Sequence, residues 1–164
     1  MIIHFTTKST NAIRAWFRRN GFTCGCGLNK HFFNDGFVYD GETHRVEVPE
    51  FYIASAVDDE LLMCLKNKGL TTETSWLVAT ILHELGHAET IHLFTESELK
   101  KVCKQKQKLS DALTEANRIQ INRTYWNLPV EDIANNWAIT YANMFPHKVD
   151  RLYKILQNNC TIAE

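Results

Sequence analysis

The feature that most constrains this chain is a strongly apolar run between residues 72 and 89 that carries ionisable groups at a regular spacing. The segment Thr-Thr-Glu-Thr at residues 71–74 offers three threonines as helix N-caps at its start, and its apolar side chains recur at helical spacing. A helix this apolar belongs in the core of a domain. The sequence therefore predicts a buried helix over residues 72–89, with His83, Glu84 and His87 inside it.

Residues 83–87 have the pattern His-Glu-x-x-His. Histidines four apart on a helix lie on the same face, so both imidazoles can bind one ion at about 2.0–2.1 Å. Glu84 follows the first of them and is placed to take a proton from a water on the metal, as a general base. Imidazole and carboxylate ligands favour zinc over magnesium or calcium. Because burying two imidazoles and a carboxylate costs several kcal/mol unless they are paired, the pattern predicts one catalytic Zn²⁺ rather than chance residues.

A catalytic zinc needs a third protein ligand. His92 lies five residues after His87, and the His-x-x-Gly-x-x-His extension of metzincins is absent, which disfavours a third histidine ligand of that kind. Glu131, in contrast, stands in the first turn of a helix that Pro129 can open. Glu131 is therefore the predicted third ligand, with Asp132 as the alternative. Either acid can also serve only to complement the helix dipole. A glycine inside the first helix, Gly86, costs roughly 1 kcal/mol relative to alanine and predicts close packing of another backbone or the floor of the metal site.

The second motif resembles known metallopeptidases. Glu131 and Asn135 are similar to the Glu-x-x-x-Asp element of gluzincins, and with Ala134 and Ala138 they resemble the Glu-x-x-Ala-Asn-x-x-Ala element of ImmA/IrrE-type metallopeptidases. The resemblance implies a zincin-like fold and a zinc metallopeptidase. Asn135 replaces the usual aspartate, so it would support a ligand histidine by a neutral hydrogen bond. The resemblance also implies that a strand before the active-site helix pairs with extended substrate; residues 44–48 are the candidate, and an edge strand that only covers the core is the alternative.

The remaining patterns predict one α+β domain over residues 1–164, mostly helical, with a small mixed or antiparallel sheet beside the active-site helix. Further helices are expected near residues 9–20, 57–67, 95–121, 129–146 and 147–158. Short strands are expected around residues 32–33, 37–39 and 44–48, with turns at 34–36 and 40–41. Trp76, Trp126 and Trp137 are expected to fill the core between the two motif helices.

Composition narrows the classes of partner. Formal net charge is −1, which provides no field for nucleic acid, and the lysines of residues 100–108 are flanked by acids, which indicates a solvated face. No apolar run approaches the ~18 to 20 residues that cross a bilayer, and no export sequence is visible, so a cytoplasmic protein is expected. Five cysteines argue against a disulfide framework. Cys24, Cys26 and His31 do not have the spacing of a structural zinc site. The two cysteines are therefore expected to be free thiols.

The sequence thus favours a metallopeptidase that hydrolyses a peptide or protein substrate with a zinc-activated water, Glu84 acting as the base. A non-peptidase zinc amide hydrolase and a regulatory or binding module that keeps the fold are the alternatives. The oligomeric state is not predicted. Four residues are candidates to stabilise the oxyanion: Tyr125, Tyr141, Tyr153 and His147.

Overall fold

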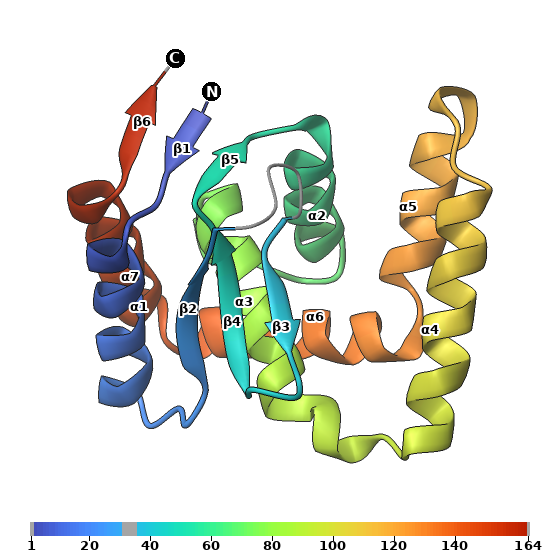
Figure 1. Cartoon of the computed structure of the whole chain (residues 1–164), viewed down its shortest axis with the longest axis horizontal. Coiled ribbons are helices and arrows are strands. Elements are labelled where there is room, and N and C mark those ends of the chain that lie inside the picture. Colours follow the sequence, from blue (N-terminus) through green and yellow to red (C-terminus); the bar gives the residue numbers. More distant parts are fainter. Residues whose placement is uncertain (1, 31–35, 164) are drawn as a thin grey trace.

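The computed structural model describes residues 2–30 and 36–163, and it confirms a mostly helical α+β fold with two small sheets. The helices are α1 (Thr7–Arg19), α2 (Ala56–Asn67), α3 (Trp76–Thr90), α4 (Glu96–Asp111), α5 (Arg118–Trp126), α6 (Pro129–Met144) and α7 (Pro146–Asn159), with short 3-10 turns η1 (Ile91–Leu93) and η2 (Glu115–Asn117) (Figure 1). None of the helices in the described part of the chain is long and apolar enough to cross a membrane.

The strands form two separate sheets rather than the single sheet expected. Strands β1 (Ile2–His4), β5 (Phe51–Ile53) and β6 (Thr161–Ala163) make an antiparallel sheet in the order β5-β1-β6. Strands β2 (Gly25–Asn29), β3 (Val38–Asp40) and β4 (Arg45–Pro49) make a mixed sheet in the order β2-β4-β3. The predicted strand at 32–33 and part of the turn at 34–36 lie outside the described residues.

The prediction that residues 44–48 form an edge strand was wrong. Strand β4 is central, because it pairs in parallel with β2 on one side and antiparallel with β3 on the other. Its backbone is therefore used on both sides and is not open to a substrate strand. The mixed sheet instead places β3 at the edge, and β3 contacts α3.

Local sequence explains where the helices begin. Ser75 caps α3 by accepting a hydrogen bond from the backbone N–H of Val78, so the helix starts a turn later than expected. Thr95 and Glu98 form a capping box at the start of α4. Proline opens both α6 and α7.

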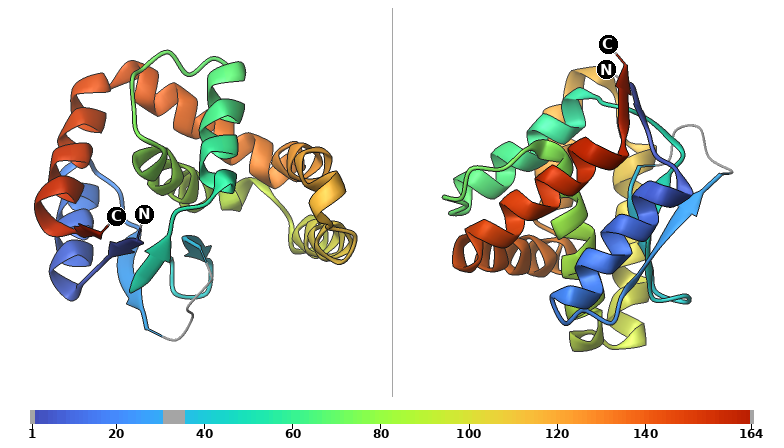
Figure 2. Two further views of the ribbon diagram at one scale, coloured as in Figure 1. Left: turned by 90° about the horizontal axis from the view of Figure 1, so that it is seen from above. Right: turned by 90° about the vertical axis from the view of Figure 1, so that its left-hand side faces the viewer.

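The single helix predicted over residues 95–121 was wrong, since α4 ends at Asp111 and the chain reverses into α5. The reversal is closed by Asn117, whose side chain accepts a hydrogen bond from Thr114 N–H and donates one to the carbonyl of Ala112. The α4–α5 pair stands apart from the main body as a helical hairpin (Figure 2). A small apolar cluster beneath it, centred on Val102, Leu128 and Val130, connects it to the start of α6.

The core lies around α3, whose residues 77–88 are all buried. Helix α6 crosses it closely, and the mixed sheet covers α3 from the opposite side through β3 and β4 (Figure 1). Trp76, Trp126 and Trp137 pack against this core but are only partly buried, so they do not fill it as predicted. Residues far apart in sequence, on α3 and α6, are thereby brought to one place.

Candidate metal centre

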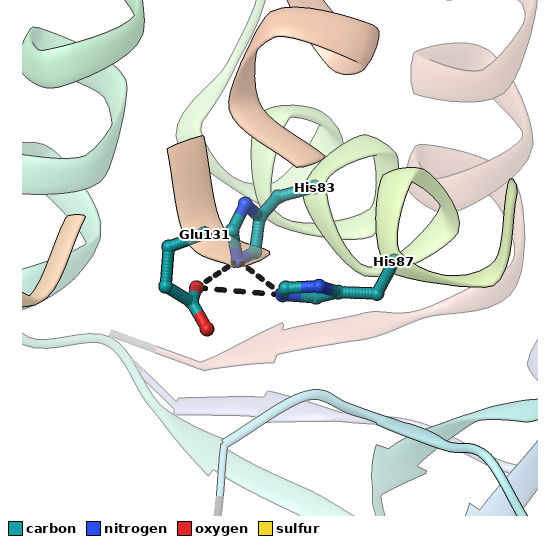
Figure 3. A group of neighbouring side chains, drawn as sticks. All are labelled: His83, His87 and Glu131. Carbon is teal, nitrogen blue, oxygen red and sulfur yellow. Dashed lines mark hydrogen bonds and ion pairs between the residues drawn. The ribbon is translucent and has the colours of Figure 1, made fainter. Parts of the chain in front are cut away.

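Three side chains from α3 and α6 point toward one another in the core (Figure 3). Oε2 of Glu131 lies 3.1 Å from Nε2 of His83 and 3.4 Å from Nε2 of His87, and the two imidazole nitrogens are 3.2 Å apart. Bonds of about 2.0 Å directed to the corners of a tetrahedron separate any two ligand atoms by ~3.3 Å. The three donor atoms therefore already have the mutual spacing that a tetrahedral zinc requires.

Gly86 makes this convergence possible. A Cβ placed on Gly86 would lie 2.5 Å from the backbone oxygen of Ala134, so the two helices touch here through their backbones, as the glycine predicted. Glu131 stands one turn before Ala134 on α6, and His83 and His87 lie on either side of Gly86 on α3. The close crossing consequently brings all three ligand side chains to one level of the core.

Asn135 fixes the protonation pattern of His83. Its Oδ1 lies 2.9 Å from Nδ1 of His83, while its Nδ2 donates to the carbonyl oxygen of Trp126 at 3.3 Å. An amide oxygen only accepts hydrogen bonds, so the proton of a neutral His83 is on Nδ1 and the lone pair is on Nε2. That lone pair faces Glu131 and His87, which is the orientation of a metal ligand.

Glu131 is an unusual carboxylate because it is completely buried, at 0 % exposure. Neither of its oxygens accepts a hydrogen bond of ordinary geometry, although cationic or imidazole nitrogens lie beside both. Burial by itself opposes its ionisation, but the adjacent imidazoles outweigh burial and hold the pKa of Glu131 far below its usual range. Burial likewise opposes charge on His83, yet the contact with Glu131 raises the pKa of His83. The group has the nitrogen and oxygen donors that could hold a metal ion.

The other candidate ligands lie elsewhere. Asp132 points away from the cluster and forms an ion pair with Lys68. His92 is exposed on η1. Among the described residues, His83, His87 and Glu131 are the one group of histidine, cysteine and acidic side chains with the proximity for a metal.

Glu84 lies at the edge of this cluster. Its Oε2 accepts a hydrogen bond of 2.7 Å from the backbone N–H of Tyr39 on β3, and its Oε1 lies 3.9 Å from Nε2 of His83. One oxygen is thus fixed by the sheet edge, and the other is directed toward the ligand nitrogens. This arrangement holds a carboxylate where a general base would be needed.

The cluster opens into a cleft of about 480 Å³. Its walls are mainly apolar, and besides α3 they come chiefly from the segment that contains β3, from α2, and from the inner face of the α4–α5 hairpin. A cleft of this size is in the range of small-molecule and short-peptide sites.

The hairpin contributes residues that the sequence analysis missed. Lys106 belongs to the stretch predicted to be a solvated face, and its neighbours Lys104 and Lys108 are indeed exposed, but its own ammonium forms an ion pair with Oε1 of Glu131. Lys106 is four residues after the buried Val102 and seven after Leu99, which also lines the cleft. This spacing places it on the inward face of the helix, and attention to helical period within the lysine run would have found it.

Of the four candidates for oxyanion stabilisation, Tyr125 alone lines the cleft. Burial, then the charge of Glu131, raises the pKa of Tyr125 to about 12, so it remains a hydrogen-bond donor near neutral pH. Tyr141 instead stacks on Trp137 with ring centroids 5.2 Å apart. Tyr153 and His147 belong to α7 and do not line the cleft. Of the four candidates, only Tyr125 therefore borders the cleft beside the three clustered side chains.

The cysteine pair forms no second metal group in the described structure. Cys24 and Cys26 are buried free thiols, and burial raises their pKa values to about 11 and about 12. His31 lies outside the described residues.

Comparison with known proteins yields no match: no protein-family model, no curated protein and no solved structure resembles this chain closely enough to identify it.

Proposed function

We propose that this protein is a zinc-dependent metallopeptidase with a gluzincin-like site. The observation that carries the proposal is the spacing of the three donor atoms, 3.1 to 3.4 Å, in a buried group that is placed next to Glu84 and opens into a cleft. The likeness of the second motif to ImmA/IrrE-type peptidases supports the same assignment.

In this proposal His83, His87 and Glu131 hold one zinc ion. When bound, the ion would polarise the scissile carbonyl and acidify a water molecule. The chain's own contribution is the control of protons. Glu84, with Oε2 fixed by Tyr39 N–H, has Oε1 available to accept a proton and later to pass it to the leaving amine. Tyr125 lines the cleft, and its hydroxyl would be the donor to the developing oxyanion.

The cleft supports a peptide substrate with apolar side chains. Leu61, Leu99 and Val102 line it from two separate helices, and the strand edge of β3 borders it. Burial of apolar groups from the substrate against these walls would supply binding free energy. A screen of peptide libraries therefore begins with apolar residues beside the cleaved bond and includes simple N-acyl amides as non-peptide substrates.

The metal assignment is tested by elemental analysis of purified wild type beside Glu131→Ala and Asp132→Ala. We expect one zinc per chain in the wild type and in Asp132→Ala, and none in Glu131→Ala, because Asp132 pairs with Lys68 and leaves the site complete. No transition metal in the wild type, even after zinc is offered, would end the proposal. Loss of zinc from Asp132→Ala alone would show that Asp132, and not Glu131, is the third ligand.

The base assignment is tested with Glu84→Gln. The glutamine oxygen can still accept the hydrogen bond from Tyr39, so zinc content and folding should be retained, while turnover should fall by about 10²- to 10⁴-fold, the usual contribution of a general base. Glu89→Gln on the same helix, outside the cleft, is the matched control and should keep wild-type turnover. Wild-type turnover in Glu84→Gln would favour a module that uses the site for binding alone.

A further inference from the structure

The two oxygens of Glu131 have different neighbours. Oε2 faces the imidazoles of His83 and His87, whereas Oε1 forms an ion pair with the ammonium of Lys106. Lys106 comes from α4, a helix that contributes no ligand to the cluster. The two oxygens of the carboxylate therefore have separate partners: Oε2 faces the two imidazoles, and Oε1 is paired with the ammonium of Lys106.

The position of Lys106 is fixed by its surroundings. Its side chain is 33 % exposed, and its Nζ lies 5.1 Å from the centroid of the Tyr125 ring, within the range of a cation–π contact. Val102, one turn earlier on α4, is buried in the apolar cluster beneath the hairpin. Lys106 is consequently anchored on the hairpin, with its ammonium directed at the base of the cleft.

The pairing of Oε1 with Lys106 limits how many oxygens of Glu131 can bind a metal ion. A carboxylate binds a metal through one oxygen or through both, and an ammonium paired with one oxygen competes with the metal for the lone pairs of that oxygen. Among the described residues, Lys106 is the one cation paired with Oε1, and no hydrogen bond satisfies this buried oxygen. Without the ammonium, both oxygens would be free to turn toward the imidazoles.

We propose that Lys106 is a positioning residue of the metal centre, which holds Glu131 to a single coordinating oxygen and so preserves a four-coordinate site with room for water. The proposal rests on the metal centre assigned above. It gives Glu131 a fixed partner in the same way that Asn135 gives one to His83, and it explains why a helical hairpin is inserted between the two motifs: the hairpin completes the site.

Cobalt substitution tests this role without recourse to catalysis. The visible absorption of bound Co²⁺ is intense when four ligands surround it and weakens when a fifth binds, so it reports the coordination number directly. Wild type, Lys106→Met, Lys106→Arg and the exposed Lys104→Met would each be loaded with one equivalent of Co²⁺. We expect markedly weaker bands in Lys106→Met, as Glu131 binds through both oxygens, and wild-type bands in Lys106→Arg and Lys104→Met.

A wild-type spectrum in Lys106→Met would overturn the role of Lys106 while leaving the zinc centre intact. An equal loss of intensity in Lys104→Met would overturn it too, because the effect would not belong to the ammonium at Oε1. Should Lys106→Met fail to fold, Lys106→Leu removes both the donor and the charge and is judged by the same two outcomes. Failure of the wild type to bind cobalt or zinc at all would instead refute the metal centre itself.

Discussion

At the scale of single residues, the site depends on side chains that hold other side chains. Asn135 is fully buried, and both ends of its amide are used: the oxygen on His83 and the nitrogen on the Trp126 carbonyl. An aspartate there would add a negative charge to a region that already contains Glu131. The amide orients the imidazole and sets its tautomer without that charge.

Replacement of Asn135 by alanine should weaken zinc binding by about 10- to 100-fold, the usual cost of removing the partner of a ligand histidine. Competition with a chromophoric chelator measures the affinity. Asn136→Ala is the matched control, since Asn136 is next in sequence and exposed, and its side chain donates a hydrogen bond to Asp132. Equal affinities in the two variants would show that Asn135 does not orient His83.

The residues of the site differ in how far the sequence could predict them. His83, Glu84 and His87 follow from spacing along one helix, which is local information. Glu131 was preferred from the sequence, but Asp132 stayed open as the alternative, because the distinction depends on how α6 is rotated against α3. Lys106 was concealed by the lysines around it, whose side chains face solvent.

At the scale of elements, the crossing of α3 and α6 determines the site. The approach of Gly86 to the Ala134 backbone leaves no room for a side chain, and the ligands are close only because the helices are. Helix propensity alone would favour alanine at residue 86, but the close approach of the Ala134 backbone allows only glycine there.

Gly86→Ala should lower the free energy of unfolding by about 1–3 kcal/mol, the range for overpacked interiors, although alanine favours a helix by roughly 1 kcal/mol. It should also reduce zinc affinity, since the ligands would separate. Urea unfolding and chelator competition measure the two effects.

Ala134→Gly, alone and combined with Gly86→Ala, completes a double-mutant cycle. The nearest atom to the added methyl is a backbone oxygen, which Ala134→Gly leaves in place, so the second change should not restore stability. Full recovery in the double variant would mean that the clash is with the side chain of Ala134 instead.

Most helices were predictable because capping residues and prolines mark their ends. The break between α4 and α5 was not predictable. The turn is closed by hydrogen bonds of Asn117, and in the sequence Asn117 cannot be distinguished from an ordinary polar residue on the surface of a helix. Strands β1, β5 and β6 have three residues each, too few to display alternation, and their pairing is between segments distant in sequence.

At the scale of the whole molecule, the candidate centre joins three parts: α3, α6 and, through Lys106, the α4–α5 hairpin. A ligand that binds the native state alone stabilises it by about 2.7 kcal/mol at a free concentration one hundred times its Kd. Zinc should therefore act on global stability as well as on chemistry.

Removal of zinc with a chelator should lower the Tm of the wild type by several degrees, and added zinc should raise it again. Calorimetry with and without chelator measures the shift. Glu131→Ala is the control and should have the same Tm in both conditions. A wild-type Tm that is unaffected by chelator would contradict a link between metal binding and stability.

The antiparallel sheet β5-β1-β6 constrains the order in which parts of the chain can fold during synthesis. Strand β1 is translated first and lies between β5 and β6, and the Ser9 hydroxyl on the following helix donates to the carbonyl of Asn159. As the chain leaves the ribosome, β1 can pair with β5 long before β6 exists, and α3 and α6 also precede β6. Contacts that span so much of the chain form slowly. We therefore expect the helices of the site to assemble first, and the closure of this sheet to be the last step of folding.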